Sequence, residues 1–149
     1  MLHRIREGLH SCLPTFILSY ITQLNDMTSA LKKQWHNLAF SGLILHEILD
    51  HPLEDETPQA RLKQVGMMTI LYTMSQAHQK LTLSNIIEIT ELTRTGVKET
   101  VDLLVKRGML TETMVKNSMG RGTARQFEIS GALLNKLSSF RAGQDGGLN

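Results

Sequence analysis

Hydrogen-bonding and cationic side chains are concentrated at the start of a segment with helical periodicity. Thr93, Arg94 and Thr95 come first, and Lys98 follows one turn later. Arginine and lysine bind phosphate oxygens and the acceptor edge of guanine, and threonine hydroxyls bond to either kind of group. A helix whose first turn carries these groups is typical of one that enters the major groove of DNA. The chemistry that this segment suggests is therefore binding.

Apolar residues behind this polar surface predict how the helix is held. Thr93 can cap the helix start with its hydroxyl, and Val97, Val101 and Leu104 then recur at i, i+4 and i+7 on one face. Gly108 ends the periodic segment. By helical projection the opposite face carries Thr95, Lys98, Glu99, Asp102 and Lys106. Such a helix packs one face on a core and leaves the other for a groove.

Two short strands with a glycine-bearing turn are predicted after this helix. Residues 110–116 and 125–130 have strand character, and Gly120 and Gly122 in the turn can adopt positive φ. Arginine on such a tip suits phosphates and a narrow minor groove. The basic residues of this hairpin that we expect to contact DNA are Lys116, Arg121 and Arg125.

Three further helices are predicted around these elements. The helix at residues 61–77 has Leu62, Val65, Thr69 and Tyr72 on one line, with Met68, Leu71 and Met74 beside it. The helix at residues 83–91 has Thr82 or Ser84 as its cap and Ile86, Ile87 and Ile89 as its apolar positions. The last helix is capped by Ser130 and carries Leu133, Leu134, Leu137 and Phe140. The order helix, helix, helix, hairpin predicts a winged helix-turn-helix.

A long apolar seam precedes this segment. Its positions alternate spacings of four and three: Ile17, Ile21, Leu24, Thr28, Leu31, Trp35, Leu38, Gly42, Leu45 and Leu49. The seam predicts one helix, or two helices broken near residues 25–28, that lay a continuous stripe against a partner surface. Gly42 would allow close backbone approach. We expect a dimer interface formed by Ile17, Ile21, Leu24, Leu31, Trp35, Leu38 and Leu45.

Between the seam and the winged segment lies the run DHPLEDETP at residues 50–58. Its two prolines and four acidic residues suit neither a helix interior nor a buried strand, so we expect a surface connection. The chain is therefore predicted to be mainly α with a small antiparallel β-hairpin, a winged helix-turn-helix with N-terminal dimerisation helices. We expect a dimerisation region at residues 1–60, a DNA-binding domain at residues 61–141 and a flexible tail at residues 142–149.

Residues 61–137 resemble the MarR family of bacterial winged-helix transcription regulators in the pattern of their motifs. The family's leucine-threonine-apolar-serine entry to the second helix appears as Leu81 to Ser84, and its serine-arginine-serine-like opening of the recognition helix as Thr93 to Thr95. Its valine followed by a valine-aspartate pair appears as Val97, Val101 and Asp102, and its lysine-lysine-glycine-leucine-like close as Lys106 to Met109. Glu91 stands in the turn where relatives usually have glycine, and the aspartate-arginine-aspartate signature of the family's wing is absent.

The resemblance implies a symmetric dimer whose two recognition helices read a pseudo-palindromic duplex. It implies contacts to bases or nearby phosphates from Thr93, Arg94, Thr95 and Lys98, and contacts to the duplex backbone from Ser84 and Asn85. Glu99 on the same helix either accepts a hydrogen bond from a cytosine amino group or costs affinity by repulsion. Relatives dimerise through helices at both chain ends, whereas here most of that task falls to residues 14–49.

Charge is unevenly distributed along the 149 residues, although the net charge is only +2. Residues 1–60 hold four Lys or Arg against seven Asp or Glu, and residues 61–141 hold twelve against six. The basic part is therefore the part with the winged pattern, as counterion release at a phosphate backbone favours. An ordinary solvated surface is the alternative explanation.

Other chemistries have weaker support in the sequence. The run HEILDH at residues 46–51 has three residues between Glu47 and His51, where a zinc-protease motif has two, and a solvated helix end explains it as well as a metal does. The lone Cys12 is either a spectator thiol or a peroxide sensor, and it excludes an intramolecular disulfide. No nucleophile-base pair, phosphate loop or carboxylate pair stands out, so an enzyme is the least favoured class and no metal or cofactor is expected.

The compartment follows from the same composition. One cysteine fits a reducing environment, no signal-peptide pattern is recognised, and no run of about 18 apolar residues could span a membrane. We therefore predict a cytoplasmic, homodimeric regulator that represses transcription by binding double-stranded DNA, with a small-molecule effector as a further possible partner. The alternative is a winged-helix protein-protein interaction module within a larger assembly.

Overall fold

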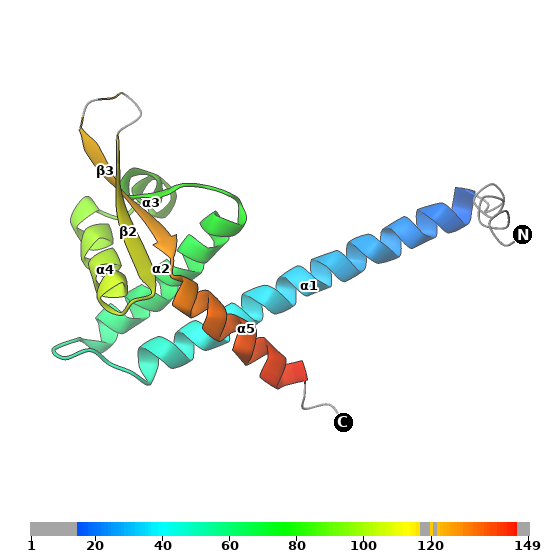
Figure 1. Cartoon of the computed structure of the whole chain (residues 1–149), viewed down its shortest axis with the longest axis horizontal. Coiled ribbons are helices and arrows are strands. Elements are labelled where there is room, and N and C mark those ends of the chain that lie inside the picture. Colours follow the sequence, from blue (N-terminus) through cyan, green and yellow to red (C-terminus); the bar gives the residue numbers. More distant parts are fainter. Residues whose placement is uncertain (1–14, 117–119, 121, 146–149) are drawn as a thin grey trace, which may run out of the picture. The chain divides into compact units, whose positions relative to one another are not determined.

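The computed structural model describes residues 15–116, 120 and 122–145 and is built mainly from helices (Figure 1). Its elements are α1 (Thr15–Leu49), α2 (Pro58–Gln76), β1 (Leu81–Thr82), α3 (Leu83–Thr90), α4 (Arg94–Lys106), β2 (Leu110–Lys116), β3 (Thr123–Ile129) and α5 (Gly131–Asp145). The predicted mainly α fold with a small antiparallel hairpin is confirmed, and the order of elements is that of a winged helix-turn-helix. Of the two alternatives for the N-terminal seam, the structure has the single helix, since α1 continues through residues 25–28.

Two units make up the chain, Met1–Leu38 and Ala39–Asn149. The end of α1, residues 39–49, belongs to the second unit, where Phe40 stacks on Tyr72 with ring centroids 3.8 Å apart. This division lies nearer the N-terminus than the predicted boundary at residue 60. The assignment of residues 1–60 to dimerisation stays a prediction.

The core of the second unit joins the end of α1 to the winged elements. Its fully buried side chains are Phe40, Ile44, Ile48, Met68, Leu71, Ile86, Val97, Val101, Leu104, Leu110 and Phe127. The predicted inner face of α4 is confirmed, because Val97, Val101 and Leu104 are all inaccessible to solvent. Burial of three such side chains anchors α4 by several kcal/mol, at ~1.5–3 kcal/mol each.

Hydroxyl caps set where the helices begin. Thr57 caps α2, whose first residue is Pro58. Thr82 rather than Ser84 caps α3, because its hydroxyl accepts from the backbone N–H of Asn85 at 3.3 Å.

The caps predicted from sequence for α4 and α5 are confirmed: Thr93 Oγ1 accepts from Gly96 N at 3.2 Å, and Ser130 Oγ accepts from Leu133 N at 3.2 Å. Gly108 follows α4 with a φ of +72°, which explains why the helix ends there.

The sheet has three strands in the order β1-β3-β2, one more than the predicted hairpin. β2 and β3 pair antiparallel from Leu110 opposite Ile129 to Lys116 opposite Thr123. β1 adds two residues on the other side of β3, with Leu81 opposite Phe127. Gly120 and Gly122 in the turn have the positive φ that was predicted, +70° and +87°.

The buried face of α2 differs from the one predicted. Leu62, which was placed on the buried line, is 64% exposed, and Gln64 is fully buried instead. Gln64 can be buried because its amide bonds to the side chains of Glu56, 8 residues earlier, and Arg107, 43 residues later. In α3 the prediction is wrong for Ile89, which is 48% exposed.

Candidate nucleic-acid interface

The first turn of α4 presents polar groups to solvent. Arg94 and Thr95 are exposed, and neither side chain has a hydrogen bond or ion pair within the described part of the chain. Thr93 is also exposed, but its hydroxyl accepts from Gly96 N and so is partly committed to the cap. Glu91, in the turn before this helix, has a φ of +54°, the left-handed conformation that glycine adopts most easily. The structure thus leaves Arg94 and Thr95 as the unengaged donors at this helix end.

The start of α3 contributes one exposed hydroxyl and one engaged amide. Ser84 is exposed, whereas Asn85 is half-buried and its Nδ2 donates to the carbonyl of Lys80 at 2.9 Å. The Asn85 amide therefore holds the turn before α3 through one of its groups. Both residues were predicted to contact the duplex backbone, and that role stays a prediction.

An ion-pair cluster, Arg125 with Asp102, Glu112 and Lys98, joins the hairpin of β2 and β3 to α4. Arg125 Nη2 donates to Asp102 Oδ1 at 2.6 Å and to Glu112 Oε2 at 2.8 Å, and its Nε donates to Glu112 Oε1 at 2.5 Å. The guanidinium also lies 5.1 Å from the ring centroid of Phe127. Lys98 Nζ donates to Asp102 Oδ2 at 2.9 Å.

These contacts lower the pKa values of the two carboxyl groups and raise that of Arg125. Burial raises the pKa of Asp102, but hydrogen bonds from Lys98 and Arg125 outweigh it and hold the pKa below its ordinary value. The pKa of Glu112 is lowered mainly by its hydrogen bond from Arg125, and the same bond raises the pKa of Arg125. These shifts favour the charged forms of Asp102, Glu112 and Arg125. Two cations that were predicted to contact DNA thus lie beside two carboxylates.

Lys98 and Arg125 differ in how freely they could leave this cluster. The side chain of Lys98 is 58% exposed and pairs with one carboxylate among the residues that the structure describes, whereas that of Arg125 is 21% exposed and spans two carboxylates. Arg125 is therefore placed as a brace between β2, β3 and α4. If Lys98 leaves the cluster, Asp102 still keeps Arg125 as its partner.

The remaining predicted contacts lie apart from this cluster. Lys116 is exposed at the end of β2, and Arg121 lies outside the described residues. Glu99 is exposed and lines, together with Lys63 of α2, a hollow of about 210 Å³ beside the start of α2. The structure thus associates Glu99 with α2, which the helical projection did not anticipate.

A buried ion-pair network around Arg107 fixes the C-terminal end of α4 and was missed from the sequence. Arg107 pairs with Glu56, donates from Nε to Gln64 Oε1 at 2.7 Å and donates from Nη1 to the carbonyl of His51 at 2.6 Å. Side chains of the pair are 5% and 1% exposed. Burial raises the pKa of Glu56. Hydrogen bonds from Gln64 and the Leu53 N–H, together with the charge of Arg107, outweigh that effect, so the pKa lies below its ordinary value.

This network corrects the prediction that residues 50–58 form a surface connection. Glu56, one of the four acidic residues in that segment, has a buried side chain. The only available signal was a basic residue just before Gly108 and an acidic run before α2, and nothing in their spacing pairs them.

The seam residues on α1 are exposed where they are described. Ile21, Leu24, Leu31 and Leu38 in the first unit and Leu45 in the second are each at least 43% exposed. Leu24, Leu31 and Leu38 follow one another at intervals of seven residues. The side chains of Ile17 and Trp35 lie outside the described part. In the expected dimer these exposed leucines would be the ones to become buried.

The close approach expected at Gly42 concerns a partner surface and stays a prediction. A Cβ added there would lie 4.0 Å from the ring of Phe140, an ordinary van der Waals distance.

The run at residues 46–51 places His46 Nδ1 2.5 Å from Asp50 Oδ2, and its two histidine rings contact edge-on. No group of three or more potential metal ligands occurs among the residues that the structure describes.

Comparisons with known proteins add little to this geometry. No family model matches the chain, and no curated protein matches it. A solved structure that is similar is the adhesin competence repressor AdcR from Streptococcus pyogenes, at 23% identity and a TM-score of 0.35, over 80% of this chain and 76% of that one. Within the described residues no helix is both long and apolar enough to cross a membrane.

Proposed function

We propose that the chain is a cytoplasmic, homodimeric regulator that binds duplex DNA through α4 and the wing and represses transcription. The observation that carries this proposal is the division of α4. Its inner face is fully buried at Val97, Val101 and Leu104, and its first turn presents the unengaged Arg94 and Thr95. A helix anchored on one side with free donors at its N-terminal end has the form that inserts into a major groove.

Each polar residue has a separate role in this proposal. Arg94 and Thr95 read base edges, and Thr93 and Ser84 reach phosphates. Lys98 exchanges Asp102 for a phosphate, and Arg125 keeps the wing oriented beside α4 so that Lys116 and Arg121 meet the neighbouring groove. The exchange at Lys98 costs little, because exposed ion pairs contribute only ~0–1 kcal/mol.

The dimer part of the proposal rests on the exposed seam of α1. Three leucines at intervals of seven residues on one helix are the pattern of a two-helix interface. Two copies joined there would carry two α4 helices, which must meet successive major grooves about 34 Å apart. A dimer bound across a promoter blocks polymerase, which is why we favour repression over activation.

The test is selection of bound fragments from the genome of the host with the full-length protein. Enrichment of one pseudo-palindromic site supports the proposal, and its loss in an Arg94→Ala variant assigns the contact. Lys136→Ala is the matched control, because Lys136 is an exposed cation on α5 that, within the described residues, pairs with Glu47. Equal enrichment of all fragments by the wild type and by the Lys136→Ala control would contradict sequence-specific binding.

A second candidate is a winged-helix module that binds protein. Two observations favour it: carboxylates neutralise Lys98 and Arg125 on the expected DNA face, and α1 exposes a row of large apolar side chains. The discriminating measurement is binding to duplex DNA at several salt concentrations. The affinity of a DNA-binding protein for duplex DNA falls as the salt concentration rises. A protein-binding module should show no such salt-dependent binding to DNA.

A further inference from the structure

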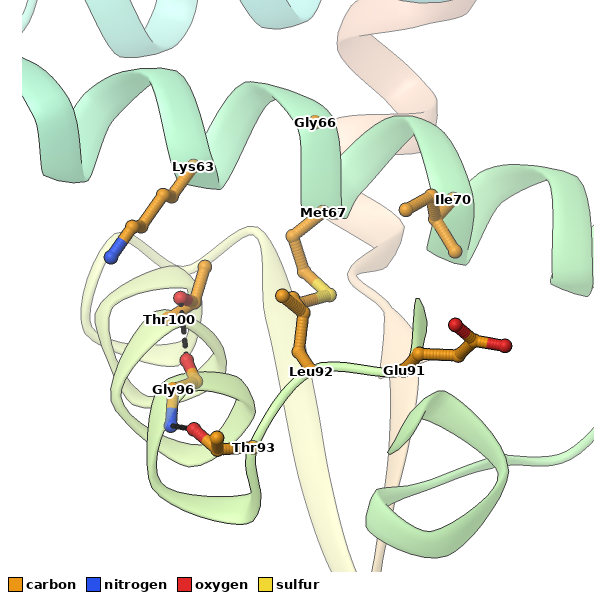
Figure 2. A pocket seen from close by; sticks show the side chains of 9 residues that line it. All are labelled: Lys63, Gly66, Met67, Ile70, Glu91, Leu92, Thr93, Gly96 and Thr100. Carbon is orange, nitrogen blue, oxygen red and sulfur yellow. Dashed lines mark hydrogen bonds between the residues drawn. The ribbon is translucent and has the colours of Figure 1, made fainter. Parts of the chain in front are cut away.

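Lys63 is an exposed cation on the side of α2 that faces α4. Figure 2 shows its side chain extending from α2 toward α4, beside Thr100. It makes no hydrogen bond or ion pair within the residues that the structure describes. Sequence reasoning did not select Lys63, although it lies next to the helix that we propose to insert into DNA.

Two hollows place Lys63 along one side of α4. The first, of about 400 Å³, is lined by Lys63 together with Gly96 and Thr100 of α4. The second, of about 210 Å³, is again lined by Lys63 and Thr100 and adds Glu99 and Leu103. Gly96, Thr100 and Leu103 follow one another at intervals of four and three residues, so they form one side of the helix. Lys63 therefore borders that side.

The hairpin of β2 and β3 borders the other side of α4. Asp102 holds Arg125 of β3 there through their ion pair. At 3.6 residues per turn, Asp102 projects about 100° around the helix from Leu103. Thr95 and Glu99, which are both exposed, fall between these two sides. The outer face of α4 thus lies between the wing and α2.

The dimensions of duplex DNA bring both sides of such a helix to phosphates. The major groove of B-DNA is about 12 Å wide, and a helix with its side chains measures about 10–12 Å across. A helix that inserts its outer face into the groove therefore fills it, and each of its sides borders one phosphate backbone. The wing reaches one backbone, and Lys63 offers an ammonium group to the other.

We propose that Lys63 is a further DNA contact, which binds a phosphate of the backbone on the side of α4 opposite the wing. This inference rests on the proposed function, because it requires α4 to lie in the groove. Glu99 limits the contact, since it lines the same hollow as Lys63 and its carboxylate competes with the phosphate for the ammonium group. Of the two roles considered for Glu99, the inference selects repulsion over a hydrogen bond from a cytosine amino group.

Binding of the full-length protein to the selected operator at several salt concentrations tests the contact. Each phosphate contact adds about 0.9 to the magnitude of the slope of log affinity against log salt concentration. Lys63→Gln should reduce that slope by about 1 and weaken binding about fivefold, the upper end for an exposed ion pair. Lys63→Arg should retain both the slope and the affinity.

Lys136→Gln is the matched control, because it removes an exposed cation from α5, and it should change neither quantity. Thermal unfolding of the Lys63 variants should occur within a few degrees of the wild type, since the side chain is exposed. Equal slopes and affinities for the wild type and Lys63→Gln would overturn the proposal.

Operators with one methylphosphonate in place of one phosphate locate the contact, because each lacks a single charge at a known position. One such substitution should weaken binding by the wild type and have no effect on the Lys63→Gln protein. Lys116→Gln in the wing should identify a different position, on the backbone across the major groove. The same position for both variants would overturn the assignment of Lys63 to the side opposite the wing.

Glu99→Gln tests the competing carboxylate. It should strengthen binding to all sequences alike, because it removes a negative charge near a phosphate. The gain should be smaller in a Lys63→Gln background, where no ammonium group remains for the carboxylate to attract. An equal gain in both backgrounds, or a changed preference at one base pair, would overturn the role of Glu99.

The outcomes separate this proposal from the function on which it rests. If the wild type shows no salt-dependent binding to DNA, both are contradicted. If the wild type binds and Lys63→Gln binds with the same slope and affinity, only the contact at Lys63 is contradicted.

Discussion

Asp102 of α4 and Arg125 of β3 are joined by a hydrogen-bonded ion pair, with Nη2 2.6 Å from Oδ1. The pair connects the helix that we expect to enter the major groove with the wing that we expect to flank it. Glu112 on β2 holds the same guanidinium, so both strands of the hairpin and α4 meet at one cation. The orientation of the wing relative to α4 therefore depends on Arg125.

The first prediction concerns the strength of this brace. A double-mutant cycle with Arg125→Ala and Asp102→Ala should give a coupling free energy of unfolding of about 0.5–1 kcal/mol, because the pair is partly exposed and screened. Urea unfolding of the four proteins measures it. A cycle for Lys98 and Asp102 should give a smaller value, since Lys98 is more exposed. A larger coupling for Lys98 would contradict the assignment of Arg125 as the brace.

The second prediction concerns acid. Folding lowers the pKa of Asp102 and of Glu112, whose ordinary values are 3.8 and 4.5. A carboxyl whose pKa is depressed in the folded state stabilises the protein above its unfolded pKa and loses that contribution as pH falls through the folded pKa. The free energy of unfolding should thus fall below about pH 4.5, and less steeply in an Asp102→Asn, Glu112→Gln protein. Identical acid profiles for the two proteins would show that the cluster is not formed.

The third prediction concerns the buried pair of Arg107 and Glu56. Arg107→Met leaves a carboxylate buried without its cation and should reduce the free energy of unfolding by about 3–5 kcal/mol. The double variant Arg107→Met, Glu56→Met should recover part of that loss, because no charge remains buried. Chemical denaturation of both proteins measures the difference. A single variant within 1 kcal/mol of wild type would contradict the network.

The fourth prediction concerns the seam of α1. Leu31→Glu should convert a dimer to monomer in sedimentation equilibrium, because a charge in the centre of an apolar interface is desolvated without a partner. Leu62→Glu is the matched control, since Leu62 is also exposed, 64% against 50% for Leu31, but lies on α2. An unchanged dimer with Leu31→Glu would place the interface on another surface.

Local features of the sequence were sufficient to predict much of the fold. The burial of Val97, Val101 and Leu104, the end of α4 at Gly108 and the caps Thr93 and Ser130 depend on neighbours within a few residues, and all are confirmed. Periodicity and capping act at that range, so sequence reasoning captures them.

Features that depend on distant partners were not predictable in the same way. Gln64 is buried in place of Leu62 because of Arg107, 43 residues later, and β1 is a strand only because β3 pairs with it. At the candidate site, Arg125 looked like a free cation on the hairpin until Asp102 and Glu112 were found beside it. Distances between remote residues decide such roles, and spacing along the chain does not report them.

The central claim is that Arg94, at the exposed start of α4, contacts duplex DNA. The most direct test measures the affinity of wild type and Arg94→Ala for the selected operator over a range of salt concentrations. We predict that the affinity of the wild type falls steeply with salt and that Arg94→Ala binds about tenfold or more weakly while remaining folded and dimeric. Equal affinity of the two proteins, or no salt-dependent binding by the wild type, would contradict the account.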